Sequence, residues 1–363
     1  MPLADLLKEG ERVMTICNAC RYCEGHCAVF PAMERRTAFP QPDLIYLANL
    51  CHGCGSCYHH CQYAPPHPFA VNVPKIFSEL RTESYKAFAW PGFLARAFDR
   101  NPLTTALVAA GSLALLFFIA GGGSGLTSRH LGSGAFYAVV SHAMMVGLFG
   151  AVFLAVVAVL GVGLVRFWRQ MSGGTARPAD LRRAVSDTLR LRYLDGGGDG
   201  CTYPTEAPSK LRRFFHHLTF YGFLLCFAST TVAAIYDGLL GWQAPYTVTS
   251  LPVLLGTAGG IGLLAGPVGL FALKLRSDPA PNPRGTAFAM DVAFLALLFW
   301  ISATGLALLV LRATAAMGVL LAIHLGFVLA LFLSLPYGKF VHAVYRYGAL
   351  VRHAMESRQC KDR

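Results

Sequence analysis

The stretch CNACRYCEGHC at residues 17–27 recurs in outline as CHGCGSCYHHC at residues 51–61. Both follow the spacing Cys-x2-Cys-x2-Cys-x3-Cys, and together they hold eight of the eleven cysteines. With this spacing, three thiolates of one run wrap the corners of a four-iron cubane, and the fourth binds the cubane of the other run. The sequence therefore predicts two [4Fe-4S] clusters. Their expected ligands are Cys17, Cys20, Cys23 and Cys61 for the first, and Cys51, Cys54, Cys57 and Cys27 for the second.

Zinc is the alternative metal for clustered cysteines, but structural zinc sites usually join two short cysteine pairs across a longer gap. The proline that commonly follows the fourth cysteine is replaced by Ala28 and Gln62, which leaves the ligands intact. No apolar leader precedes the cysteines, so we expect them in the reducing cytoplasm, where clustered cysteines indicate metal chemistry. We predict a mostly α-helical, ferredoxin-like dicluster domain over residues 1–101.

From residue 102 onward the chain has the composition of a membrane protein. The mean hydropathy is +0.48 and only 14% of residues are charged, against about 25% in soluble domains. Six apolar stretches each reach the ~20 residues that span a bilayer. Glycines in the fourth stretch predict close helix packing. We therefore expect a six-helix transmembrane bundle over 102–346, with spans at roughly 103–121, 135–165, 214–236, 249–275, 287–311 and 316–343.

The net charge of +12 reflects membrane orientation rather than nucleic-acid binding. Ten Lys and Arg lie in residues 1–101, ten in 166–213 and six from residue 339 onward, whereas the alternate connections hold one or none. Basic connections stay on the cytoplasmic side. We expect both termini, the loop at 166–213 and a tail at 347–363 to be cytoplasmic. The run Gly196–Gly198 in that loop is more typical of a plain turn than of a phosphate-binding loop.

Histidines within or beside the spans predict haem, because a histidine inside a bilayer is costly and usually functional. His324 and His342 lie eighteen residues apart in the sixth stretch, which is five helical turns, so we expect both side chains on one face about 27 Å apart. Matching depths pair His142 with His324 on the outer side, and His216 or His217 with His342 on the inner side. We predict one or two b-type haems with bis-histidine ligation. The alternative is that these histidines are structural.

Several longer motifs resemble a known family. They are LRYLDGGG at 191–198 followed by Gly200-Cys201, RRFFHHLTFYGF at 212–223, TSLPVLLGT at 249–257, LAIHL at 321–325 and LPYGKFVH at 335–342. Together with the cysteine runs they make the whole chain similar to the tricarballylate-utilization protein B family, also called the citrate-utilization CitB family. Because the motifs are long and spread over nearly the whole chain, the resemblance is specific.

This resemblance implies a partner and a reaction. In the family, a soluble FAD-dependent tricarballylate dehydrogenase oxidises tricarballylate to cis-aconitate, and the membrane protein reoxidises its flavin. Electrons would pass through the clusters and b-type haem to quinone, at the bacterial inner (cytoplasmic) membrane, with membrane lipid around the bundle and no nucleic acid involved. No catalytic residue is implied. The alternative is a haem-free, cluster-bearing membrane anchor that recruits a dehydrogenase and reduces quinone directly.

Overall fold

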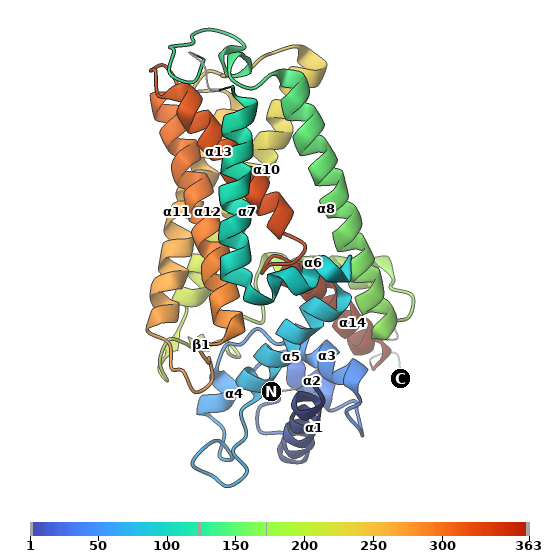
Figure 1. Ribbon diagram of the computed structural model, residues 1–363. Helices are drawn as coiled ribbons and strands as arrows, with labels where there is room; N and C mark the ends of the chain where they lie inside the picture. Colours follow the sequence, from blue (N-terminus) through green and yellow to red (C-terminus); the bar gives the residue numbers. More distant parts are fainter. Residues whose placement is uncertain (1–2, 122–124, 172, 361–363) are drawn as a thin grey trace.

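The computed structural model describes residues 3–121, 125–171 and 173–360, and it has two parts placed end to end (Figure 1). A long helical bundle occupies one end, and a smaller helical domain built from the N-terminal residues occupies the other. In the described part of the chain, the strands are β1 (Cys201–Thr202) and β2 (Pro208–Ser209), which pair antiparallel. The prediction of a mostly α-helical fold with an N-terminal cluster-type domain is confirmed.

The N-terminal domain packs its helices so that the two cysteine loops emerge where helices end. The helices are α1 (Leu3–Cys20), α2 (Val29–Met33), α3 (Gln41–Leu50), α4 (Ser56–His59) and α5 (Val73–Phe88). Helix α3 is buried from Leu44 to Leu50, and Tyr46 and Phe77 are fully enclosed in the core. Because α1 ends at Cys20 and α3 ends one residue before Cys51, a rigid core fixes the start of each cysteine loop.

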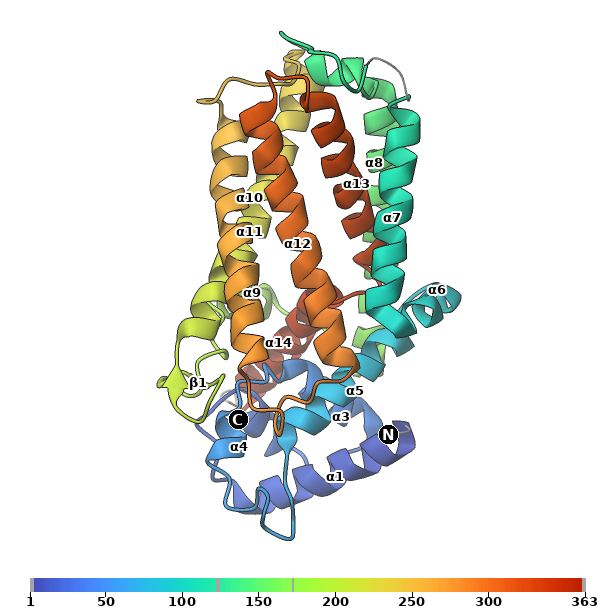
Figure 2. The ribbon, with the colours of Figure 1, turned by 60° about the vertical axis from the view of Figure 1, so that its left-hand side comes forward.

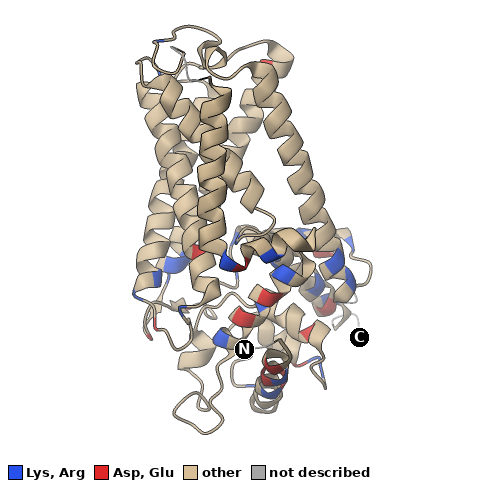
Figure 3. Cartoon of the chain, viewed as in Figure 1, with Lys and Arg blue, Asp and Glu red and all other residues tan. Residues whose placement is uncertain are grey.

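Six segments are long and apolar enough to cross a membrane, which confirms the predicted number of spans within the described residues. They are Gly92–Ile119 (α6 at Gly92–Ala97, η1 at Phe98–Arg100 and α7 at Asn101–Ile119), α8 (His142–Gln170), α10 (Leu211–Leu240), α11 (Leu251–Leu275), α12 (Thr286–Leu311) and α13 (Met317–Ser334). Charged residues gather at the end of the molecule that carries the N-terminal domain (Figure 3). The chain is a multi-pass membrane protein.

The glycine-rich fourth span lies against the third with almost no space between the two backbones. A Cβ on Gly222 of α10 would be 2.9 Å from the carbonyl oxygen of Gly259. A Cβ on Gly259 of α11 would in turn be 2.8 Å from the amide nitrogen of Cys226. Small residues therefore let α10 and α11 approach closely, as the glycine spacing predicts.

The sixth span is shorter than predicted. Helix α13 ends at Ser334, and a separate helix, α14 (Val341–Gln359), begins after a turn. Pro336 cannot donate the hydrogen bond that would continue the helix, and Gly338 is a poor helix former. His324 and His342 therefore lie on different helices. The prediction of five continuous turns and a shared face is wrong.

Helix α14 covers most of the segment predicted as a tail, and it packs against α3, α8 and α9 (Pro178–Leu189). Arg36 Nη2 is 2.7 Å from Glu356 Oε1, and Arg352 Nη2 is 3.0 Å from Asp43 Oδ1. Both guanidinium groups lie over the ring of Tyr46. This partly buried network fastens the C-terminal helix to the N-terminal domain. Residues 1–2 and 361–363 of the predicted domains lie outside the described part.

Candidate functional site

The first set of thiols surrounds one cavity. Cys17, Cys20, Cys23 and Cys61 line a space of about 270 Å³, and Cys57 borders it. Burial, together with repulsion from the neighbouring Cys23, Cys61 and Cys20 thiolates, raises the pKa of Cys17 to about 12. Four crowded thiolates are favourable only beside a cation, so this donor set fits an iron–sulfur cluster.

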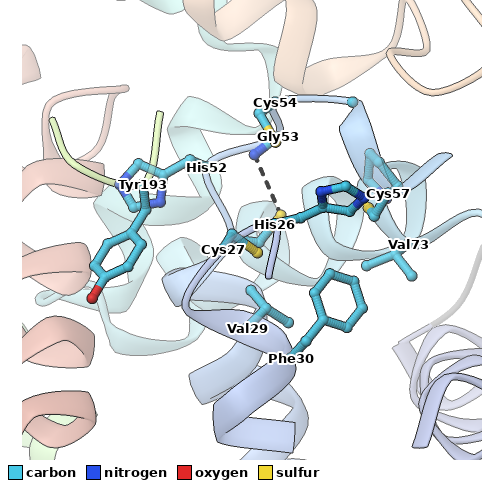
Figure 4. A pocket seen from close by; sticks show the side chains of 13 residues that line it. His26, Cys27, Val29, Phe30, His52, Gly53, Cys54, Cys57, Val73 and Tyr193 are labelled. Atoms are coloured by element: carbon cyan, nitrogen blue, oxygen red, sulfur yellow. Dashed lines mark hydrogen bonds between the residues drawn. The ribbon is translucent and has the colours of Figure 1, made fainter. Parts of the chain in front are cut away.

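The second set lies deeper in the molecule. Cys27, Cys51, Cys54 and Cys57 line one pocket together with His26, His52 and Tyr193 (Figure 4). Cys51 and Cys54 are only 6% and 7% exposed. The structure thus groups the thiols as the spacing predicts, with Cys27 and Cys61 exchanged between the runs. In the described residues, no three His, Cys, Asp or Glu side chains converge tightly enough for a single metal ion.

Polar groups approach the sulfur atoms of the second set. The Gly53 N–H donates to Cys51 Sγ at 3.3 Å, the dashed line in Figure 4. Ser56 Oγ lies 3.7 Å from Cys54 Sγ. A hydrogen bond from the Cys201 side chain lowers the pKa of Cys54 below its ordinary value. These contacts stabilise the thiolate, which is the form that binds iron.

The glycine turn predicted at Gly196–Gly198 closes over both cysteine loops. Gly196 has φ +56°, and a Cβ there would lie 2.6 Å from Ser56 Oγ of the second loop. A Cβ on Gly197, at φ +91°, would lie 3.2 Å from the Gly25 carbonyl of the first loop. Strand β1 adds to this cover, since a Cβ on Gly55 would be 2.6 Å from the Thr202 carbonyl. The segment 196–202 is therefore part of the site.

Of the two adjacent histidines that the sequence could not separate, the structure brings His216 to His342. Their ring centroids are 6.3 Å apart with an interplanar angle of 76°. Metal–imidazole bonds are about 2 Å long, so two imidazoles on opposite sides of one metal have centroids roughly 6 Å apart. His217 instead packs against Tyr221, with centroids 5.7 Å apart.

The hydrogen bonds of this inner pair also suit ligands. The Nδ1 of His342 is 2.6 Å from the Lys339 carbonyl oxygen, an arrangement that leaves Nε2 free for a metal. Burial, aided by Lys339 and Arg346, lowers the pKa of His342 well below its ordinary value, so the ring is neutral as ligation requires. The Nδ1 of His216 is buried with no hydrogen-bond partner. These residues fit a bis-histidine haem.

The outer pair is arranged differently. His324 Nδ1 lies 3.1 Å from the Ile301 carbonyl and 3.2 Å from Thr304 Oγ1, and its ring fits against Gly305. His142 is the first residue of α8, and its Nε2 pairs with Asp237. His324 lies seven residues into α13, about 10 Å along the helix axis. His142 therefore faces a carboxylate, whereas His324 faces a backbone carbonyl and a threonine hydroxyl.

The two family models that match cover most of the chain. One, described as Citrate utilization protein B, matches residues 96–362, and the other, its Fer4-like domain, matches residues 10–87. The chain belongs to the citrate utilization protein B family. A family member from Escherichia coli, Citrate utilization protein B, is 48% identical over 360 residues, which cover 98% of this chain and 93% of the relative. No solved structure matched.

Family membership confirms the resemblance seen in the sequence motifs. The Fer4-like match spans both cysteine runs and indicates an iron–sulfur, electron-transfer type of domain.

The sequence did not point to a set of arginines beside the second cysteine loop. They are Arg81, Arg212 and Arg346, named here the arginine collar. A signal was present, since Arg212 precedes His216 by four residues and Arg346 follows His342 by four, on the same helix faces.

Proposed function

We propose that this citrate utilization protein B family member reoxidises the flavin of a soluble FAD-dependent dehydrogenase and passes the electrons to quinone. The observation that carries the proposal is the spatial order of the sites along the molecule. A partly exposed thiol set is followed by a buried one, and the buried set lies beside the His216–His342 pair. The family name supports a tricarboxylate such as tricarballylate as the dehydrogenase's substrate.

Two crossed thiol sets would hold two [4Fe-4S] clusters, and His216 with His342 would hold one b-type haem. When bound, these groups divide the two-electron oxidation of flavin into one-electron steps. The chain's own residues bind and orient them. The core around α3 fixes the cysteine loops, the 193–202 segment excludes water from the buried set, and the Lys339 carbonyl orients the His342 ring.

The partner would dock at the end of the N-terminal domain farthest from the bundle. Tyr22 lines the first thiol cavity and is 68% exposed, and Phe69, which packs against Tyr63 of the same cavity, is also exposed. The distribution of Lys and Arg supports a bacterial inner membrane protein with both termini cytoplasmic, so that a soluble dehydrogenase can reach this surface.

The decisive experiment combines a spectrum with a turnover assay. The protein in lipid vesicles, supplied with reduced tricarballylate dehydrogenase and a quinone, should form quinol. The purified protein should show a b-type band on reduction. His216→Ala and His342→Ala should lose that band, whereas His217→Ala, the matched neighbour, should keep it.

The alternative of a haem-free anchor makes the opposite prediction for the spectrum. Quinol formation by a protein that has clusters but no b-type band would support the anchor and reject the haem assignment. If no quinol forms with intact clusters, the proposed electron acceptor is wrong.

A further inference from the structure

We propose that the arginine collar makes the cluster held by Cys27, Cys51, Cys54 and Cys57 the higher-potential member of the pair. The first cluster then gives up its electron to the second rather than sharing it. This inference deepens the proposed function and rests on its assignment of two clusters. It concerns three residues of this chain that act on the second loop through its backbone.

The contacts of the collar converge on a short stretch of backbone. Arg81 Nη1 donates to the carbonyls of Ala48 at 3.1 Å and Cys51 at 2.7 Å. Arg346 Nη2 donates to the same Cys51 carbonyl at 2.8 Å. Arg212 donates through Nη1 to the Gly53 carbonyl and through Nη2 to the His52 carbonyl. Three cations from α5, α10 and α14 thus hold the loop that carries Cys51 and Cys54.

These cations are close and poorly screened. Arg81 is only 9% exposed, and burial lowers the pKa of Arg346 to about 10, which still leaves it protonated at neutral pH. A buried positive charge acts through a low effective dielectric and stabilises an electron added nearby. Local charge, hydrogen bonding and solvent exposure are the variables that set cluster potentials. The positive charge and the hydrogen bonds to sulfur favour reduction at the second site, and they act against its burial, which opposes added negative charge.

The first loop has a different environment. Its arginine, Arg21, is exposed and donates to the Asn18 carbonyl within its own loop. Gln62 Nε2 reaches Cys20 Sγ only at 3.8 Å. An added electron is less stabilised here.

The step that follows is a single electron transfer. One electron leaves the first cluster, which is oxidised, and enters the second, which is reduced, with no bond or proton exchanged. The electron comes from the reduced flavin of the partner dehydrogenase. Two collar residues also lie on the helices that carry the inner histidine pair. Arg212 and His216 share a face of α10, and Arg346 and His342 share a face of α14.

The test is a redox titration of the holoprotein followed by electron paramagnetic resonance. Arg346→Gln and Arg212→Gln keep hydrogen-bond donors but remove the charge. Each should lower the equilibrium constant for reducing the second cluster about tenfold, a shift of about 59 mV for one electron. Arg346→Lys should restore much of it. Arg213→Gln is the matched control, because Arg213 pairs with Asp195 and the Arg190 carbonyl instead.

Assignment of the two signals keeps the inference falsifiable even if the arginine variants do not fold. The higher-potential signal of the wild-type protein should be altered in the Cys57→Ser variant and unaltered in the Cys20→Ser variant. The reverse assignment overturns the inference, and so do Arg346→Gln and Arg212→Gln titrations that match Arg213→Gln. Iron and sulfide analysis distinguishes failure of the proposed function from failure of this inference. A protein without clusters refutes both, whereas two intact clusters of equal potential refute only the proposed effect of the arginine collar.

Discussion

The two cysteine loops share one spacing and differ in almost everything around it. The first is partly open, with a cavity of about 270 Å³ beside the exposed Tyr22. The second is enclosed by β1 and the glycine turn, and it is held by the arginine collar. The two loops thus share the spacing that would place cluster ligands, and they differ in burial and nearby charge, which under the proposed electron path would separate the potentials of two bound clusters.

The largest expected effect tests the exchange of ligands between the loops. Cys27 belongs to the first cysteine run in the sequence but lines the second pocket. The Cys27→Ser variant should therefore damage the second cluster. About half of the cluster iron should be lost. The surviving resonance signal should match that of Cys57→Ser. A surviving signal that matches that of Cys20→Ser would show that each run keeps its own fourth ligand.

Removal of iron should distinguish the loops next. A chelator with a mild oxidant should extract iron from the first cluster faster, because Cys51 and Cys54 of the second are 6% and 7% exposed. Stopped samples, analysed by resonance spectroscopy, follow each cluster separately. Equal rates, or faster loss from the second cluster, would contradict the difference in burial.

A glycine exchange should sharpen the comparison at the level of stability. Gly55→Ala places a Cβ 2.6 Å from the Thr202 carbonyl at a residue with φ +85°, which should cost about 1–3 kcal/mol and lower the occupancy of the second cluster. Gly25→Ala in the first loop is the matched control, since a Cβ there meets nothing within 4 Å. Thermal unfolding and iron content measure both. Equal behaviour of the two variants would argue against the close cover by β1.

The smallest effect concerns Cys201. Cys201→Ala removes one hydrogen bond to Cys54, worth about 1 kcal/mol, and should lower the potential of the second cluster by less than the collar variants do. Cys226→Ala, in the bundle, should leave both potentials unchanged. The same redox titration checks both variants. A larger shift in the potential of the second cluster for Cys201→Ala than for Arg346→Gln would contradict the view that arginine charge outweighs this hydrogen bond.

Local spacing and hydropathy were sufficient to predict the six spans, and the spacing gives the same thiol sets that line the two pockets, with Cys57 bordering both. They did not reveal the collar, because Arg81, Arg212 and Arg346 meet only after three distant helices pack. Nor did they choose between His216 and His217, which differ by about 100° around α10. The end of α13 at Ser334 was not predicted because the sequence stays apolar up to Pro336, although a proline at this position is itself a helix-ending signal.

The central claim is that two four-iron clusters are held by crossed thiols. The most direct test is the amount of iron, acid-labile sulfide and haem per polypeptide in the purified protein. The account predicts about eight cluster irons with about eight sulfides, and one b-type haem. About four irons with four sulfides, or zinc in place of iron, would contradict it.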